Sequence, residues 1–587
     1  MNILGLSALD KESTATILRD GAIVAAVSEE RLTRVKQQGG FPYQAVASAL
    51  ALSGLTAREI DVVAYPFFHA HEELALLGGA ALRDLSRWTA KVRYRGLRHT
   101  LRHYGAFGKA LGTAFPSKLL TCDRQLAEGL KALGIRGRRR RYDHQYCHAV
   151  SAYYTSQFDR ALVATLDWYG SGKAGAIYLA EGGRLRLIKT IHFPDSLGVM
   201  YAGVTSALGF IPDRHEGKVV GLAAYGDPSR LAPGVLQRFA ARATGDEFLD
   251  ALDLSAIRTL VASHTREDVA AAHQHALETV VLKQLSCYLQ RFRVDHVAVA
   301  GGVFANVKLN ERIVEHPGVA SLFVHPAMGD MGSGTGAALA AALEAGDLRE
   351  PVPMVSAFLG PSVDEQAIEA AVTRLGLPYR HEPDMPRRIA ELLAHGKIVG
   401  RCIGRMEYGP RALGNRSVLA STVDASVTER LNQKLRRNDF MPFAPATLAS
   451  AAGRCYDQTE KVRHAAQFMT VCLSCTPWMR QASPAAVHVD GTARPQFVTP
   501  DSNPDLHQIL IETERLTGIP SVINTSFNIH EEPIVCSPDD AVRGFLEAGL
   551  DALAIGNILV RRAPATDDRM TDGHHHIAAA TTVDSKR

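Results

Sequence analysis

The stretch GRMEYGPRALGNRSVLA, residues 404–420, interleaves Arg405, Arg411 and Arg416 with three glycines and a proline. Guanidinium groups bind phosphate and carboxylate oxygens through paired hydrogen bonds, and glycines let the backbone bring its N–H groups close to a ligand. The segment therefore predicts an anion-binding site. Spacing alone is equally compatible with an exposed basic loop. Other parts of the sequence are needed to distinguish the two interpretations.

The composition is that of a globular protein with two or three domains, because 587 residues that are 46% hydrophobic and 21% charged can form several cores. A net charge of +4 gives no strong overall attraction for nucleic acid. Residues 87–104 and 136–141 are locally basic. We interpret them as solvated helix faces or as walls of an acceptor channel, since neither lies in a recognisable nucleic-acid-binding module.

Eight scattered cysteines are too few for a disulfide framework in a chain of this size, which favours a reducing, cytoplasmic setting. Cys472 and Cys475 form one isolated pair inside an apolar run, and we interpret them as buried strand residues rather than half of a zinc site. The N-terminal sequence lacks the basic head and apolar stretch of a signal peptide, and no apolar run of about 18 residues occurs. We expect a cytoplasmic protein without a membrane span.

Two segments have the pattern strand, hairpin, strand. Apolar runs at 3–6, 16–18 and 23–27 flank a turn at Asp20-Gly21, and residues 161–191 repeat the pattern around a turn at 181–183. Residues 296–310 and 322–343 each follow with a strand, a glycine turn and a helix, where phosphate or adenosine often binds. The repeat predicts a duplicated nucleotide-binding fold of the actin type.

The polar, proline-bearing segment 347–356 predicts a linker. It separates a domain at 1–346 from a second α/β domain at 357–563, which carries residues 404–420 and alternating strand and helix patterns. Residues 564–587, with three adjacent histidines, are expected to be a flexible tail.

The sequence DHQYCH, residues 143–148, places His144 and His148 on one face of a predicted helix. Their spacing lets both imidazoles reach one metal ion, although the same spacing is common in helix cores. Asp167 and Asp330 follow predicted strands next to glycines and strengthen the metal interpretation. Two imidazoles and two carboxylates suit iron, manganese or zinc about equally.

Several further segments occur in the order found in one family. They are SEERLTRVKQQGGFP (28–42), GFIPDRHEGKVVGLAAYGDP (209–228), PAMGDMGSGTGAAL (326–339), VHVDGTARPQ (487–496) and INTSFNIHEEPIV (523–535). Together with residues 404–420 they resemble the NodU/CmcH-type O-carbamoyltransferases over nearly the whole chain. The resemblance implies an α/β protein with an N-terminal actin-like (TsaD-like) domain and a C-terminal YrdC-like domain.

The resemblance also implies a reaction. The C-terminal domain would bind carbamoyl phosphate and release carbamate, and carbamate and ATP with Mg²⁺ would give carbamoyl adenylate. The N-terminal domain would hold the adenylate beside a divalent metal, usually iron, and transfer the carbamoyl group to a hydroxyl of a small natural product or glycan. Because carbamate is unstable in water, a closed passage between the sites would serve a physical purpose.

The resemblance assigns site residues by position. The implied metal ligands are His144, His148 and Asp330, with Asp167 completing the set. The implied nucleotide-binding residues are Gly301, Gly302, Asn306, Gly329, Gly332 and Lys218. The implied carbamoyl phosphate ligands are Arg405, Arg411, Arg416, Lys434, Arg436, Arg494, Asn524, Ser526 and Asn528.

The first hairpin loop departs from the family, which commonly has a His-Asp pair where this chain has Asp10, Lys11 and Glu12. A protonated lysine is a poor base, so either Glu12 or Asp10 replaces the function or the acceptor is held differently. Lys36 is a further candidate for activating the acceptor hydroxyl.

Two other departures affect ligand assignment. Trp168 and Tyr169 follow Asp167 where the family often has glycine, which permits either stacking on a ligand or packing beneath the loop. The register around Lys434 to Arg437 is shifted, so the roles of Lys434, Arg436 and Arg437 stay open individually.

Two rival functions remain. The first is a TsaD-type enzyme that modifies tRNA, and only the two basic stretches favour it. The second is a regulatory protein that binds nucleotide but does not carbamoylate an acceptor. The altered hairpin loop, which lacks the His-Asp pair of the family, favours it. The acceptor pocket is expected in the variable segments 65–120 and 240–275.

Overall fold

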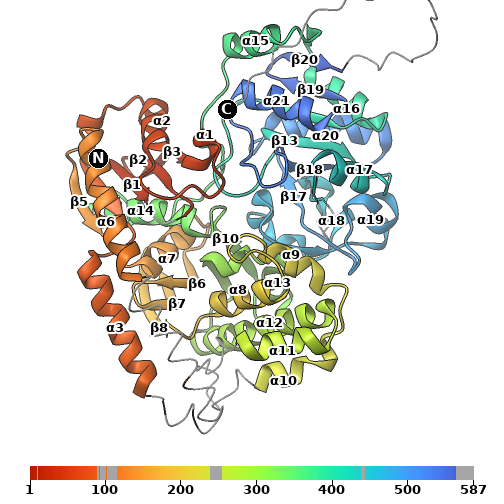
Figure 1. Cartoon of the computed structure of the whole chain (residues 1–587). Helices are drawn as coiled ribbons and strands as arrows, with labels where there is room; N and C mark the ends of the chain where they lie inside the picture. Colours follow the sequence, from red (N-terminus) through yellow and green to blue (C-terminus); the bar gives the residue numbers. More distant parts are fainter. Residues whose placement is uncertain are drawn as a thin grey trace, which may run out of the picture.

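The computed structural model describes residues 1–8, 11–86, 88, 92, 101, 115–237, 254–437 and 443–562. The fold is mixed α/β, as predicted, and contains two five-stranded sheets, one eight-stranded sheet and one two-stranded sheet among these residues. In Figure 1 the C-terminal unit, coloured teal to blue, lies beside the two N-terminal sheets.

The two five-stranded sheets have the same topology. The first contains β1 (Asn2–Ser7), β2 (Thr14–Arg19), β3 (Ala22–Ser28), β4 (Val62–Tyr65) and β5 (Arg138–Arg141), in the order β3-β2-β1-β4-β5. The second contains β6 (Arg160–Gly170), β7 (Lys173–Glu181), β8 (Arg184–His192), β9 (His296–Ala300) and β10 (Ser321–Val324), in the order β8-β7-β6-β9-β10. In both, the first three strands are antiparallel and the last two join in parallel, so the duplication predicted from the hairpins is present.

Two helices cross between these sheets. Helix α7 (His144–Tyr154) follows the first sheet but packs on strands of the second, and α14 (Ser333–Ala345) follows the second sheet but packs on the first. The helices also contact each other, and glycine makes the close approach possible: a Cβ on Gly336 would lie 2.0 Å from the Cys147 carbonyl oxygen. The exchange brings the loop before α14 next to the start of α7.

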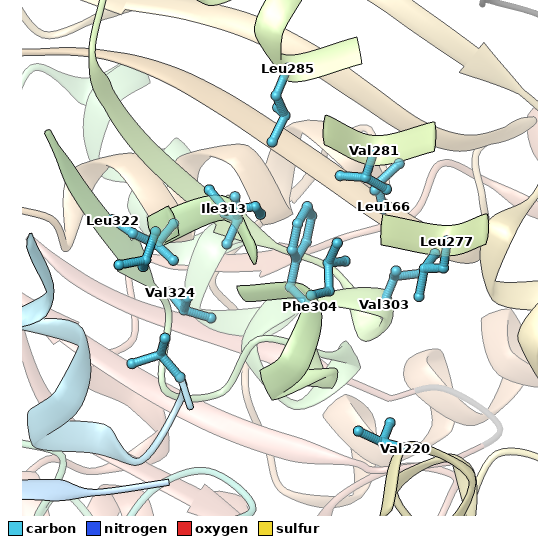
Figure 2. Packing of buried hydrophobic residues seen from close by; sticks show 14 of the residues in the cluster. Leu166, Val220, Leu277, Val281, Leu285, Val303, Phe304, Ile313, Leu322 and Val324 are labelled. Atoms are coloured by element: carbon cyan, nitrogen blue, oxygen red, sulfur yellow. The ribbon is translucent and has the colours of Figure 1, made fainter. Parts of the chain in front are cut away.

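Helices cover the outer face of the second sheet. They are α8 (Leu197–Ala207), α9 (Glu216–Ala223), α10 (Ala232–Gln237), α11 (Leu254–Ser263), α12 (Arg266–Phe292) and α13 (Val307–Glu315). Figure 2 shows the fully buried Phe304 among apolar side chains of α12, α13 and the sheet, including Val281 and Ile313. The first sheet is covered by α1 (Glu29–Thr33), α2 (Tyr43–Ser53) and α6 (Phe115–Ala132), while α3 (Ala70–Ser86) contacts α6 and packs against Phe193, which follows the second sheet.

The C-terminal unit is built on the eight-stranded sheet. Its order is β11 (Tyr379–His381), β20 (Ile558–Arg561), β19 (Ala552–Ile555), β12 (Val399–Cys402), β13 (Arg416–Ser421), β18 (Ser521–Ser526), β14 (Pro445–Leu448) and β17 (Gln496–Val498). Helices α16 (Met385–Ala394) and α20 (Pro504–Thr517) belong to one apolar cluster, and α15 (Glu365–Arg374), α17 (Val427–Lys434) and α21 (Pro538–Ala548) to another. Strands β15 (Leu473–Ser474) and β16 (Thr492–Ala493) pair separately, and Cys472 and Cys475 beside them are buried, as predicted.

The N-terminal unit, which contains the two five-stranded sheets, shares a hydrophobic core with the C-terminal unit. The largest apolar cluster joins the second sheet to residues of the C-terminal unit such as Tyr456 and Phe497. The predicted linker at 347–356 contains neither strand nor helix, and it is tied to the end of α7 through Val352 and Met354. The two units are therefore packed against each other, and this contact is what allows a site to form between them.

Three further sequence predictions concern the C-terminal tail and the two basic stretches. The expected tail at 564–587 and most of the basic stretch at 87–104 lie outside the described residues. In the other basic stretch, Arg140 pairs with Glu344 and Arg141 with Asp123, so two of its charges are neutralised. None of the helices in the described ranges combines the length and apolar character needed to cross a membrane.

Candidate active site

The structure brings His144, His148, Asp167 and Asp330 into one cluster. Their ligand atoms all lie within 4.8 Å of one another. The Asp167 carboxylate lies 3.0 Å from His144 Nε2 and 3.2 Å from His148 Nε2, and the Asp330 carboxylate lies at 3.4 and 3.6 Å from the same two atoms. All four residues predicted as metal ligands therefore converge.

Local sequence explains how the cluster is positioned. Asp143 caps α7 by accepting a hydrogen bond from the Tyr146 N–H, which fixes the start of the helix at His144. The His144 ring packs against Gly170 of β6, where a Cβ would lie 2.1 Å from a ring carbon. Phe67 covers the same ring, with centroids 4.5 Å apart. Small and apolar neighbours thus hold the imidazole without competing for its Nε2.

The donor set fits a divalent metal. In the described part of the chain, Asp330 Oδ1 faces the two Nε2 atoms and is buried without a hydrogen bond, which is costly unless a ligand compensates. Burial lowers the pKa of His144, but the adjacent carboxylates of Asp167 and Asp330 outweigh burial and raise it to about 10. Burial and Asp330 raise the pKa of Asp167, but the two histidines outweigh them and hold it at about 2. The cluster is built to accept positive charge, from protons or from a metal.

The cluster of His144, His148, Asp167 and Asp330, which we call the metal cluster because its donors suit a metal ion, opens into a cavity of about 350 Å³, which we call the acidic cavity. Its lining carboxylates are Glu12, Asp167, Asp213, Glu216 and Asp330, against the cations Lys11, Arg214 and Arg411. Apolar residues of α8, α9 and α12, among them Val220 and Leu277, form another part of the wall. Such a mixture of an apolar wall and a few convergent polar groups is typical of a small-molecule site.

The predicted nucleotide-binding residues divide into two groups. Gly302, Asn306 and Gly329 line the acidic cavity. Gly301 and Gly332 do not: a Cβ would lie 2.2 Å from the Leu166 carbonyl oxygen at Gly301 and 2.1 Å from that of Ala327 at Gly332. Those two glycines permit close backbone packing. Lys218 lines the neighbouring cavity instead.

The predicted catalytic residues are also divided. Lys11 and Glu12 line the acidic cavity, and Lys11 Nζ lies 3.2 Å from the Asp213 carboxylate. Burial and the nearby Asp330 raise the pKa of Glu12 to about 7. Lys36 lines the other cavity, 3.7 Å from the Glu30 carboxylate. Asp10 lies outside the described residues.

The two aromatic residues after Asp167 have different places. Trp168 lines the acidic cavity, so stacking on a ligand is open to it. Tyr169 packs edge-on against Phe193, with centroids 5.2 Å apart, and its hydroxyl lies 3.4 Å from Glu73. Packing beneath the loop therefore describes Tyr169.

A second cavity of about 370 Å³ lies between the two units, and we call it the basic cavity. It is lined by the cations Lys36, Arg214, Lys218, Lys308, Arg411, Arg437 and Arg494, and by the carboxylates Glu531 and Glu532. Asn524, Ser526 and Asn528 add neutral polar groups to its wall. The excess of positive charge favours an anionic ligand.

Arg411 and Arg494 are two cations of this cavity that lie close enough to repel each other. Burial and the adjacent Arg494 lower the pKa of Arg411, and burial lowers that of Arg494. No described carboxylate forms an ion pair with either guanidinium, and Arg411 Nε is buried without a hydrogen bond. Two like charges placed together without a counter-charge require an anion for compensation.

Four predicted ligands of carbamoyl phosphate are not brought to the basic cavity. Arg405 donates to the carbonyls of Val24, Leu359 and Gly360, and the fully buried Arg416 donates to several carbonyls, including those of Ile403 and Gly404. Lys434 donates to the Gly549 carbonyl. Arg436 is exposed and has a positive φ of 53°. Three of these residues therefore bind backbone carbonyls within the protein, and the fourth is exposed to solvent.

Arg437, which the sequence left open, takes the place expected of Arg436. Its guanidinium donates to Thr525 and Ser526 at 2.9 Å and to Asn528 at 3.0 Å. Lys308 was not predicted at all; it reaches the cavity from α13 and pairs with Glu311 and, at 2.9 Å, with Asp490. The sequence offered one indication of Lys308, which is that it follows the predicted nucleotide ligand Asn306 by two residues.

The two cavities abut. Residues that line both are Gln37, Arg214, Gly217, Val220, Ala305, Pro410 and Arg411. Arg411 therefore stands where the basic cavity meets the acidic one, and it belongs to the segment 404–420 from which the sequence analysis began.

Comparison with known proteins identifies the family. Models of the carbamoyltransferase N-terminus and C-terminus match residues 2–339 and 390–562. The chain belongs to the carbamoyltransferase family. It is an enzyme of the transferase class, and the resemblance seen in the sequence motifs is confirmed.

Named relatives of this carbamoyltransferase cover almost its full length. Nodulation protein NolNO of Sinorhizobium fredii is 30% identical over 95% of this chain and 80% of its own length. Nodulation protein U of the same species is 27% identical over 90% of this chain and 94% of its own. Full-length HypF, solved in a phosphate- and nucleotide-bound form, overlaps 58% of this chain and 56% of its own at a TM-score of 0.32 and 13% identity, which is too loose a likeness to support a conclusion.

Proposed function

We propose that this carbamoyltransferase uses ATP and carbamoyl phosphate to form carbamoyl adenylate, and that it transfers the carbamoyl group to a hydroxyl of a small natural product or glycan. Its fold would combine an actin-like, TsaD-like N-terminal unit with a YrdC-like C-terminal unit. The two similar five-stranded sheets support the actin-like part. All eight cysteines are free, which agrees with a cytoplasmic setting.

The basic cavity would bind carbamoyl phosphate. Arg411 and Arg494 would supply charge-assisted hydrogen bonds to the phosphate, and Arg437 would be held in place by Ser526 and Asn528. Water attacks the carbonyl carbon, the bond from that carbon to the phosphate oxygen breaks, and carbamate and inorganic phosphate result. The neutral donor Asn524 lines the same wall.

Carbamate would react with ATP where the cavities meet. A carbamate oxygen attacks the α-phosphorus, the bond to the bridging oxygen breaks, and pyrophosphate leaves. Arg411 and Arg214 line both cavities and would stabilise the negative charge that develops on the phosphates. Since carbamate decomposes in water, direct contact between the cavities would protect it.

The acidic cavity would hold the adenylate. His144, His148, Asp167 and Asp330 would bind a divalent metal, for which iron is the first candidate and manganese or zinc the alternatives. When bound, the metal supplies positive charge that makes a nucleotide phosphate a better leaving group. Gly302 and Gly329 line the cavity and leave room for the nucleotide close to the backbone.

Glu12 is the proposed base for the acceptor. It lines the acidic cavity, and its raised pKa suits proton transfer near neutral pH. The acceptor hydroxyl attacks the carbonyl carbon of the adenylate, its proton passes to Glu12, and AMP leaves with the bridging oxygen. Lys11 pairs with Asp213 and would remain protonated, so it is assigned charge balance instead.

The observation that carries the proposal is the position of Arg411. It lies where the basic cavity meets the acidic cavity, and neither it nor the nearby Arg494 forms an ion pair with a described carboxylate. Incubation with ATP and carbamoyl phosphate, followed by measurement of pyrophosphate, tests it. We expect release only when both substrates are present. Release without carbamoyl phosphate, or none with both substrates, would refute the proposal.

A further inference from the structure

Tyr408 of the C-terminal unit reaches into the N-terminal unit. Its side chain is 2% exposed and packs in a small cluster with Ala26, Ala327 and Met331. The Tyr408 hydroxyl donates to the Met331 carbonyl at 2.7 Å. The tyrosine therefore touches the loop that carries Asp330, although it belongs to segment 404–420.

The direction of the surrounding hydrogen bonds follows from counting protons. Tyr408 gives its single hydroxyl proton to Met331, so the contact of 2.7 Å with Thr335 must be donated by Thr335. Thr16 then donates to Thr335 at 2.8 Å. The Met331 carbonyl also accepts a hydrogen bond from Thr14 at 2.9 Å. This carbonyl is thus held by two buried hydroxyls, one from each unit.

Asp330 is adjacent to that carbonyl and begins the short helical turn Asp330–Gly332. Its Oδ1 atom has no hydrogen bond among the described residues. Ser333 donates to the Asp330 carbonyl at 2.7 Å. A displacement of the Met331 carbonyl would therefore move Asp330 relative to the two histidines.

The other end of the contact leads to the basic cavity. Gly409 has a φ of 103°, and a Cβ there would lie 2.8 Å from the Pro326 carbonyl oxygen, so the segment is packed directly on the loop. Pro410 and Arg411 follow and line both cavities. An anion bound at Arg411 would fix the same short segment that supports Met331.

We propose that Tyr408 is a positioning residue that holds Asp330 for metal binding and transmits the binding of an anion at Arg411 to the metal cluster. The inference rests on the proposed function, in which Asp330 is a metal ligand and Arg411 contacts phosphate. By linkage, anion and metal must then each strengthen the binding of the other.

The rate of Co²⁺ loss tests the proposal without any measurement of activity. The protein is loaded with Co²⁺, and release into excess EDTA is followed by the absorption of the bound ion, with and without inorganic phosphate. Because residues that support a metal ligand typically affect affinity by 10- to 100-fold, we expect Tyr408→Phe to release Co²⁺ about tenfold faster than the unmodified protein. Phosphate should slow release in the unmodified protein and leave the variant unaffected.

A second variant and a control complete the test. Thr14→Val removes the other hydroxyl on Met331 and should also speed release, while phosphate should still slow it because Tyr408 is intact. Tyr456→Phe, which removes a buried hydroxyl bonded to Thr447, should behave like the unmodified protein.

Three results would count against the inference. Unchanged release in both Tyr408→Phe and Thr14→Val would overturn it. Faster release that phosphate still slows in Tyr408→Phe would overturn the transmission from Arg411. If the unmodified protein retains no Co²⁺ that depends on His144, the metal site of the proposed function fails, and the role of Tyr408 fails with it.

Discussion

The Nε2 atoms of His144 and His148 lie 3.0 Å apart, and both point at the carboxylates of Asp167 and Asp330. Two imidazoles held this close compete for the same protons, whereas one metal ion satisfies both lone pairs. We expect the double variant His144→Ala, His148→Ala to lose the bound metal while it keeps its fold.

Elemental analysis of the purified protein measures this loss. His464→Gln is a suitable control, because His464 is a buried histidine outside the cluster whose Nε2 lies 2.8 Å from the Met354 carbonyl oxygen. Metal content that stays unchanged in the double variant would show that the histidine pair is structural.

Arg494 lines only the basic cavity, unlike Arg411. Removal of one charge-assisted contact costs about 1.5–3 kcal/mol, so Arg494→Ala should lower kcat/KM for carbamoyl phosphate by roughly 10- to 100-fold. The KM for ATP should change little. Steady-state kinetics with each substrate varied in turn checks this, and equal losses for both substrates would place Arg494 at the interface of the units instead.

Arg436 and Arg437 form a matched pair. Arg437 contacts Ser526 and Asn528 at the wall of the basic cavity, while Arg436 is exposed. We expect Arg437→Ala to impair pyrophosphate release at least tenfold, since a cation at the wall of the basic cavity is lost, and Arg436→Ala to keep the activity of the unmodified enzyme. Similar behaviour of the two variants would contradict the assignment.

Glu12→Gln should separate the two half-reactions. Glu12 lines the acidic cavity but not the basic one, so pyrophosphate release should survive and carbamoylation of the acceptor should fall by about 10²- to 10⁴-fold, the usual contribution of a general base. Lys11→Ala should have a smaller effect on the same step. Normal product formation in Glu12→Gln would exclude it as the base, and lost pyrophosphate release would place the loop on ATP itself.

Gly336 tests the contact between α7 and α14. An added Cβ would lie 2.0 Å from the Cys147 carbonyl oxygen, so Gly336→Ala must push the helices apart and should cost about 1–3 kcal/mol of unfolding free energy. Gly78 lies inside α3 with open space around it, and Gly78→Ala should stabilise by about 0.5–1 kcal/mol. Urea unfolding of both variants gives the comparison, and equal stabilities would mean that the two helices repack without strain.

Much of the fold could be predicted because it depends on local patterns. The turn at Asp20-Gly21 has positive φ at both residues, as a two-residue hairpin requires, and the strands lie on either side of it as predicted. The convergence of four His and Asp side chains could be predicted from the spacing of His144 and His148, from the glycine-flanked Asp167 and Asp330, and from the family resemblance. The exchange of α7 and α14 between the sheets had no local signal, because the glycines that permit it also suit a phosphate loop.

The basic cavity was predicted less completely for a physical reason. Arginines that bind a ligand and arginines that bind backbone carbonyls have the same spacing in sequence, and only the fold shows that Arg405 and Arg416 do the latter. The choice of Arg437 over Arg436 depends on the turn after α17, where Arg436 takes a left-handed conformation. Lys308 reaches the cavity across the interface between the units, which no local pattern reveals.

The most direct test of the account uses ¹³C-labelled carbamoyl phosphate and ATP without an acceptor, with rapid quenching and mass spectrometry of the nucleotides. We predict a labelled carbamoyl adenylate in the unmodified enzyme and roughly 10- to 100-fold slower formation of it in Arg494→Ala at the same low concentration of carbamoyl phosphate. Label that reaches an added acceptor while no adenylate forms, and without pyrophosphate release, would contradict it.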